Sequence, residues 1–535
     1  MSSHSSRGSC GEVKDGELGG KLVAAWGYEF EWTRQHTTPE QMRPLLFSYD
    51  VLATECLDRL DELAPVSLPS KAGEGRTTQG GKAATVDGEP TSDGKEDPGE
   101  RGGHHHHHRD LFELLRQHAH RDETLQRLWT EVNTVPEWVD WQQIKRGQHV
   151  FYRYVGPFLV GLTFQSLLGG MAFHRVVETL ARTGGFGMGA ARRRLLETFQ
   201  HVLDVTEGLE AVQPGREQGG KGWASTVRVR LLHASVRRRI LRLAASDPEY
   251  FDVARYGVPV NDLDSIGTVL AFSASLIWVS FPRQGIFLRE SEIADYIALW
   301  RWVAYLLGTP TDALATPAAA RTMMESLLAW TDEFVPSAAS QDLANNIIAS
   351  LAGQPPTYPS ADFLRAEAYW LNGHALAAAL AVPRPPRYYT VLVAGQCLFF
   401  MAMSYAKRAV PAWERRSIRR LRPMLRAVVL EQAGGRDATH AFKYIPNPGK
   451  FTRVAAGQRP TEGDGSGSGA ETKRGEQEQY VTTTARGQWL RSSSSSSPVE
   501  RRALQALLVA SALAAWAAWL CAKSASSLFQ TATLG

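Results

Sequence analysis

The chain has 535 residues, of which 43% are apolar and 21% are charged. This apolar share can build a folded core, and it excludes a wholly disordered or fibrous protein. The 59 basic and 55 acidic residues leave a net charge of +4, which is too small to indicate a nucleic-acid partner. The four cysteines lie far apart without metal-ligand spacing, so a reducing compartment is expected.

Two segments lack the apolar residues that packing needs. Residues 67–106 are rich in Gly, Lys, Asp and Glu, and residues 453–502 are rich in Gly, Ser and Thr. Such compositions predict disorder. We therefore expect a disordered N-terminus over 1–19, a folded domain over 20–452 that carries the disordered insertion 67–106, and a disordered linker over 453–502.

Within the folded domain, apolar residues recur mostly at three- and four-residue spacings, which indicates helices. Alternation typical of strands is scarce. In chain order, helices are predicted at 39–64, 110–130, 155–182, 190–208, 225–246, 264–281, 290–307, 316–335, 340–352, 360–381, 389–407 and 411–433. We interpret the apolar run from Tyr389 to Ala406 as a buried core helix. The predicted fold is a single large all-α domain.

A further apolar segment lies near the C-terminus. Arg501 and Arg502 precede twenty uncharged residues, 503–522, which as a helix would be about 30 Å long and could cross a bilayer. Residues 1–20 hold no apolar stretch typical of a signal peptide. We expect 503–522 to be a C-terminal transmembrane helix that tethers a cytosolic domain. The alternative is an alanine-rich helix that packs against protein.

Phosphate-loop, nucleophile-elbow and zinc-protease motifs are missing, and the informative segment is the helix around His233. At 100° per residue, Arg230 and Arg237 lie within about 60° of His233 on a face that also holds aliphatic residues. Arginines turned inward need anionic partners. A histidine between two arginines suits haem, with imidazole for the iron and guanidinium groups for the propionates. The alternative is a core histidine whose arginines pair with Asp or Glu.

Arg194 and Thr198 show a similar pattern on the predicted helix 190–208. Both lie on one face with Val202 and Val205, so that an arginine and a hydroxyl are carried inward together. Such a pair could form a polar pocket for a small oxygen ligand. The alternative is that the hydroxyl of Thr198 hydrogen-bonds to its own helix backbone, as threonines in helices commonly do.

Several strings of residues occur in a recognisable order and spacing. They are Pro136-Glu137-Trp138-Val139-Asp140-Trp141, Arg146-Gly147-Gln148, Thr183-Gly184-Gly185-Phe186, Arg194-x-x-x-Thr198, Arg230-x-x-His233-x-x-x-Arg237, Tyr256-Gly257-Val258-Pro259-Val260-Asn261, Phe272-Ser273, Gly285 and Trp300-Arg301. With these strings, the chain resembles, over roughly 20–450, the family that unites bacterial latex-clearing proteins (rubber oxygenases) with the fungal endoplasmic-reticulum-bound oxygenase of mycophenolic-acid biosynthesis.

The resemblance implies an all-α fold that binds a b-type haem (haem b) and its iron. His233 matches the family's proximal iron ligand, and Arg230 and Arg237 match the arginines beside it. Arg194 and Thr198 match polar residues on the distal side, where dioxygen would bind.

Two glutamates bear on the reaction that the resemblance implies. Glu178 matches the family's proposed general base, with a surface glutamate as the alternative. Glu197 stands where the rubber-cleaving members have a distal lysine, so lysine capping of the iron is not expected. The implied activity is that of a haem-dependent oxidoreductase, an oxygenase that uses O₂ to cleave a C=C bond in a lipophilic, isoprenoid-type metabolite.

The resemblance also favours the endoplasmic reticulum as the membrane to which the chain is tethered. Two other readings remain open. One is a haem protein with peroxidase-like oxidative chemistry. The other is a non-enzymatic, membrane-tethered helical scaffold, in which the inward histidine and arginines serve only packing and ion pairs.

Overall fold

The computed structural model describes residues 20–65, 110–183, 186–187, 190–215, 219–330, 336–432, 500–502 and 505. The predicted N-terminal tail, insertion, linker and transmembrane segment lie almost entirely outside the described residues, so these predictions stay predictions. Gly184 and Gly185 of the resemblance also lie outside them.

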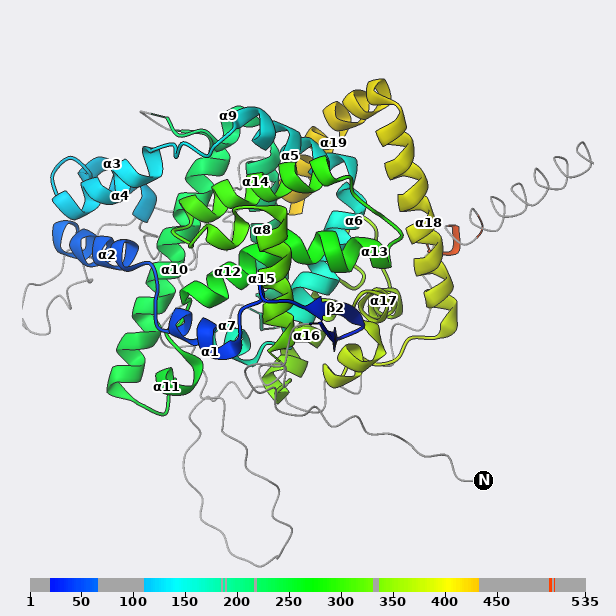
Figure 1. The fold of residues 1–535 in the computed structure, drawn as a ribbon, viewed down its shortest axis with the longest axis horizontal. Coiled ribbons are helices and arrows are strands. Elements are labelled where there is room, and N and C mark those ends of the chain that lie inside the picture. The colour runs from blue at the N-terminus through cyan, green and yellow to red at the C-terminus, as the bar shows by residue number, and fades with distance from the viewer. Residues whose placement is uncertain are drawn as a thin grey trace, which may run out of the picture.

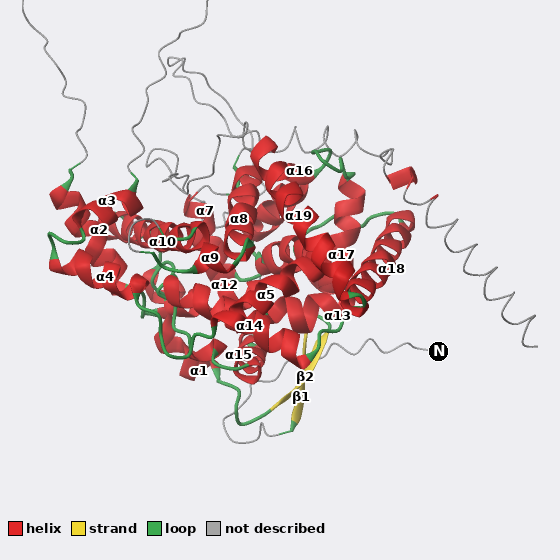
Figure 2. Ribbon diagram, turned by 90° about the horizontal axis from the view of Figure 1, so that it is seen from above, coloured by secondary structure: helices red, strands yellow, loops and turns green. Residues whose placement is uncertain are grey.

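The described residues are mostly helical, which confirms the predicted all-α fold (Figure 2). The α-helices are α1 (Pro39–Met42), α2 (Val51–Leu63), α3 (Leu111–His118), α4 (Glu123–Asn133), α5 (Trp141–Arg153), α6 (Val155–Val160), α7 (His174–Thr183), α8 (Ala191–Thr206), α9 (Leu209–Val212), α10 (Lys221–Ser246), α11 (Val253–Tyr256), α12 (Asp262–Phe272), α13 (Phe281–Arg283), α14 (Glu290–Leu306), α15 (Pro317–Ala329), α16 (Ala338–Leu351), α17 (Ala361–Ala379), α18 (Arg387–Ala409) and α19 (Pro411–Gln432).

A small antiparallel hairpin precedes the helices. Strands β1 (Lys21–Ala25) and β2 (Tyr28–Trp32) pair with Val23 opposite Phe30. Trp26 and Gly27 join them with φ values of 52° and 76°, the left-handed backbone that a two-residue hairpin turn requires. The hairpin packs on α15, where Tyr28 donates a hydrogen bond to the carboxylate of Glu325.

Helix α10 is the element around which the larger core is built, and Figure 1 shows it crossing the molecule. It contacts α2, α3, α8, α9 and α14. Gly222 allows a close approach to α8, because a Cβ at this position would lie 2.6 Å from the carbonyl oxygen of Asp204. The absence of a side chain thus brings the helix of His233 against the helix of Arg194 and Thr198.

Helices α7, α16 and α17 enclose a second cluster of buried apolar residues. Helix α18 packs on α17 and runs along the outer edge of the molecule (Figure 1, yellow). It is long and apolar enough to cross a membrane, with a mean hydropathy of 1.4. Helix α12 and the segment Leu276–Arg283, which are bent relative to each other, would also be long and apolar enough if they formed one span. The helix predicted over 389–407 forms as part of α18, but the interpretation of Tyr389 to Ala406 as a buried core helix is wrong, since Val391, Leu398 and Phe399 are exposed.

Other predicted helices differ from the structure at breaks that have local causes. The prediction 155–182 spans α6, a π-helical stretch at Gly161–Leu168 and α7, with Gly169 and Gly170 preceding the last helix. Helix α5 is absent from the prediction because its composition is largely polar. Its start is nevertheless marked by Asp140, whose carboxylate accepts a hydrogen bond from the backbone of Gln142.

Candidate functional site

His233 projects from the middle of α10 and is only partly covered by protein. Its neighbours on the same face, Val229 and Val236, are likewise half-buried. No hydrogen bond to the imidazole occurs among the described residues. Burial lowers the pKa of His233 to about 4, with Arg237 and Arg194 contributing in the same direction. The ring is therefore neutral at neutral pH, which is the form that binds a metal ion.

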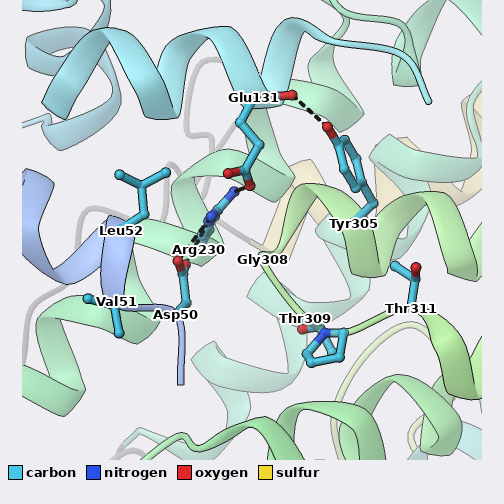
Figure 3. A pocket seen from close by; sticks show the side chains of 10 residues that line it. Asp50, Val51, Leu52, Glu131, Arg230, Tyr305, Gly308, Thr309 and Thr311 are labelled. Atoms are coloured by element: carbon cyan, nitrogen blue, oxygen red, sulfur yellow. Dashed lines mark hydrogen bonds and ion pairs between the residues drawn. The ribbon is translucent and has the colours of Figure 1, made fainter. Parts of the chain in front are cut away.

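Arg230, one turn before His233, is buried and fully engaged by carboxylates (Figure 3). Its Nε and Nη2 donate to the two carboxylate oxygens of Asp50 at 2.7 and 3.0 Å, and its Nη1 donates to Glu131 at 2.8 Å. Burial alone would lower the pKa of Arg230, but the two carboxylates raise it above its usual value. Arg230 therefore matches the alternative expectation, in which the arginine pairs with acidic side chains.

The same ion pair forms one wall of a pocket of about 410 Å³, which is also lined by Tyr305 and the loop after α14. Gly308 in that loop has φ +71°, and a Cβ there would lie 2.6 Å from both Nε of Arg230 and Oδ2 of Asp50. Tyr305 donates a hydrogen bond to the backbone carbonyl of Glu131 (Figure 3). The pocket and the ion pair therefore depend on a glycine at position 308.

Arg237, one turn after His233, is buried in a different way. Its Nη1 donates to the backbone carbonyl of Asp50 and to the hydroxyl of Thr54, and its Nη2 donates to the carbonyl of Val260. None of these partners is a carboxylate, and Nε is buried with no hydrogen-bond partner. Burial lowers the pKa of Arg237, although the charge of Asp50 opposes this. The guanidinium thus keeps one buried donor available for an anionic group.

On α8, Arg194 lies beside Glu197, with 3.2 Å between Nη1 and Oε2. Glu197 is buried and also accepts from Nε of Arg193 at 2.9 Å, so two arginines flank this carboxylate. Thr198 is exposed, so the prediction that its hydroxyl is carried inward is wrong, whereas Val202 on the same predicted face is buried. The start of α8 is more exposed than its later turns, in which residues 201–206 are all buried.

His201 is a residue of this neighbourhood that the sequence patterns did not single out. It is buried on α8, and its Nδ1 lies 2.9 Å from the hydroxyl of Ser225 on α10. Burial lowers the pKa of His201 to about 4, and His233 contributes to that shift. Two neutral histidines from the two packed helices therefore belong to one neighbourhood. The sequence did hold a signal for His201, which lies three residues after Thr198. Residues at that spacing share one side of a helix.

Glu178 lies on α7 and is buried, so it is not the surface glutamate of the alternative reading. Its carboxylate forms an ion pair with Arg182 of the same helix and lies 3.3 Å from Nε2 of His174. Arg182 also donates to the backbone carbonyl of Tyr250. Glu178 is thus a positioned carboxylate with a cation beside it.

These residues fit haem at two points. Among the described residues there is no group of three or more His, Cys, Asp and Glu side chains arranged to hold a metal ion. His233 can offer iron a neutral imidazole, which is what a porphyrin requires of a protein on one side. The unpartnered Nε of Arg237 suits a propionate, while Arg230 is already balanced by Asp50 and Glu131.

Comparison with known proteins places the site within a recognised domain. Residues 152–402, just under half of the chain, match the family described as ER-bound oxygenase mpaB/B'/rubber oxygenase, catalytic domain. The segment contains all six residues that were predicted for the site. It is shorter than the resemblance expected over 20–450, and Asp50 and Glu131 lie outside it.

Two individual proteins are similar over limited parts. A stretch of 33 residues is 58% identical to aurantioclavine synthase cnsA of Penicillium expansum, and covers 6% of this chain and 7% of that protein. The structure of latex clearing protein LCP in the closed state aligns with a TM-score of 0.43 and 17% identity, over 58% of this chain and 79% of that one. The match to the family, within the all-α fold described above, identifies residues 152–402 as a catalytic domain of the ER-bound oxygenase mpaB/B'/rubber oxygenase family.

Proposed function

We propose that this chain is a haem-dependent oxygenase that cleaves a C=C bond in a lipophilic, isoprenoid-type metabolite. One observation carries the proposal. The matched catalytic domain contains His233, whose imidazole is neutral and half-buried and makes no hydrogen bond to a described residue. The reaction balances without a further reductant, because one O₂ and one C=C bond give two carbonyl groups.

In this proposal, a bound haem b would supply the redox-active iron for the O₂-dependent step. His233 would hold the iron, and Nε of Arg237 would donate to a propionate carboxylate. The half-buried aliphatic surface of Val229 and Val236 would contact the flat, apolar part of the group and exclude water.

In the proposed site, α8 and α7 provide the residues on the side opposite His233. Arg194 and the exposed hydroxyl of Thr198 are donors that can stabilise negative charge on an oxygen ligand. The negative charge of Glu197 is balanced by Arg193 and Arg194, which form ion pairs with it. Glu178 would accept or return a proton during the rearrangement of bonds, with Arg182 as its fixed counter-charge.

We also propose that the chain resides at the endoplasmic-reticulum membrane with the catalytic domain in the cytosol, tethered through 503–522. A lipophilic substrate partitions into such a membrane. The test is extraction of isolated membranes with alkaline carbonate, which removes peripheral proteins. The full chain should stay in the membrane, and a chain that ends at Ser497 should be released. Retention of both would mean that another segment is the anchor.

The central experiment is the absorption spectrum and iron content of the purified protein after addition of haem. The wild type should show a Soret band, and His233→Ala should lose it while keeping its helicity. His36→Ala is the control, because His36 is a buried histidine that stacks on Trp32 of the hairpin, outside the matched domain. A His233→Ala protein with unchanged spectrum and iron would refute the ligand, and a wild type without a Soret band would favour the scaffold reading. Prenylated substrates offered with O₂ or with peroxide then separate an oxygenase from a peroxidase.

A further inference from the structure

Helix α18 presents an apolar stripe to the outside of the molecule. Val391, Leu398 and Phe399 are 52%, 60% and 59% exposed, while the opposite side of the helix packs on α17. The stripe continues at Tyr405, whose hydroxyl accepts a hydrogen bond from the backbone N–H of Phe287. Phe287 is itself 61% exposed, so an unrelated loop adds an aromatic ring to the same surface.

Exposed arginines precede and follow this stripe along the chain. Arg384 and Arg387 stand at the start of α18, and Val410 connects its end to α19, where Arg416 and Arg420 are exposed. None of these four arginines pairs with a carboxylate of the described chain. An apolar stripe between clusters of unpaired cations is the pattern by which a helix lies in the interface of an anionic membrane.

Helix α19 repeats the pattern in its own sequence. Trp413, Arg416, Arg420 and Met424 follow each other at spacings of three and four residues and therefore share one face. Trp413 and Met424 are exposed, and tryptophan is enriched at the level of lipid headgroups. The outward sides of α18 and α19 thus each combine apolar side chains with arginines.

We propose that this surface, defined by Phe287, the α18 stripe and the exposed arginines of α18 and α19, docks on an anionic phospholipid bilayer. The helix lies on the bilayer instead of crossing it, because its other side is buried on α17. A second copy of the chain is the poorer occupant. A two-fold contact through this surface would set arginines against arginines, whereas anionic headgroups neutralise them.

Hydrogen–deuterium exchange of the full chain tests the proposal, because it reports on α18 itself even if 503–522 also inserts. Vesicles of phosphatidylcholine with phosphatidylserine should slow exchange in 387–409, and vesicles of phosphatidylcholine alone should do so much less. Leu398→Glu with Phe399→Glu should abolish the protection with unchanged thermal unfolding. Leu22→Glu is the control, since Leu22 is 66% exposed on the β1 strand.

Reversal of the charges in Arg416→Glu with Arg420→Glu should weaken binding to the anionic vesicles by about tenfold or more, since basic residues near such a surface are attracted to it and acidic residues are repelled. The proposal fails if α18 exchanges equally fast with and without vesicles, or if neutral vesicles protect it equally. It also fails if the Leu22→Glu chain loses protection as the double variant does. Protection in lipid-free solution that rises with protein concentration, together with a dimer in light scattering, would assign the surface to a second copy.

Discussion

Asp50 accepts two hydrogen bonds from the buried guanidinium of Arg230, at 2.7 and 3.0 Å, across 180 residues of sequence. Its side chain also accepts from the backbone N–H of Ala53 and so caps α2. Asp50→Asn keeps a good capping residue but removes the charge opposite Arg230. Loss of one partner of a buried ion pair should cost about 3–5 kcal/mol in the free energy of unfolding, measured with urea.

Asp58→Asn is the matched control for this measurement. Asp58 lies in the same helix and pairs with Arg238 and Arg242, but it is 52% exposed. A surface ion pair of this kind contributes about 0–1 kcal/mol. Equal losses for the two variants would show that the pair between Asp50 and Arg230 has no special weight in the fold.

Gly308→Ala should disturb the same ion pair from the other side. The new Cβ would meet Arg230 and Asp50 at 2.6 Å, and the φ of +71° is itself unfavourable for alanine. Gly353→Ala isolates the backbone contribution, because Gly353 has φ +67° and a methyl group added there would meet nothing within 4 Å. We expect a loss of about 1 kcal/mol at Gly353 and a clearly larger one at Gly308 in urea unfolding. Equal losses would mean that the loop moves aside freely.

A buried carboxylate on α17 gives the stability a pH dependence. Burial raises the pKa of Glu367 to about 7, although a hydrogen bond from Gln396 opposes the shift. The folded state therefore holds a proton that the unfolded state releases near pH 4.5, so its stabilising effect is present below pH 4.5 and is lost as pH rises through 7. Glu367→Gln should remove this dependence and raise the unfolding free energy at pH 8 relative to pH 5 by up to about 3 kcal/mol. An identical pH profile in both proteins would contradict the assignment.

The sequence predicts best those features that depend on the geometry of a single helix. The angular positions of Arg230 and Arg237 about His233 predict that both are carried inward, and both are buried. The same pattern leaves their partners open, because Asp50 and Glu131 come from elements that only the tertiary fold brings to α10. Hydrogen-bond partners between distant segments have no signature in local periodicity.

The errors in the fold have the same origin. An apolar run such as the one in α18 has the composition of a core helix, and only its place at the edge of the molecule exposes Leu398 and Phe399. His201 escapes prediction because Arg194 and Thr198 alone define the pattern on α8. Its relation to Ser225 depends on the close approach of α8 and α10 at Gly222, which is a property of packing.

Arg194 and Thr198 give the sharpest test of the oxygen side of the proposed site. Thr198→Val keeps the shape of the side chain and removes the hydroxyl. Because Thr198 is exposed and makes no hydrogen bond with the described residues, this change should leave the melting temperature nearly unchanged.

If the hydroxyl stabilises charge on bound oxygen, turnover per haem should fall by about tenfold, which corresponds to roughly 1.4 kcal/mol of transition-state stabilisation. Arg194→Ala removes a charged donor and should slow turnover further, because the lost hydrogen bond corresponds to roughly 1.5–3 kcal/mol of transition-state stabilisation. The haem content should stay near that of the wild type. Arg193→Ala is its control, because Arg193 also contacts Glu197 but is exposed. A lower melting temperature with unchanged turnover per haem in Arg194→Ala, together with unchanged turnover in Thr198→Val, would assign both residues to the fold and remove them from the site.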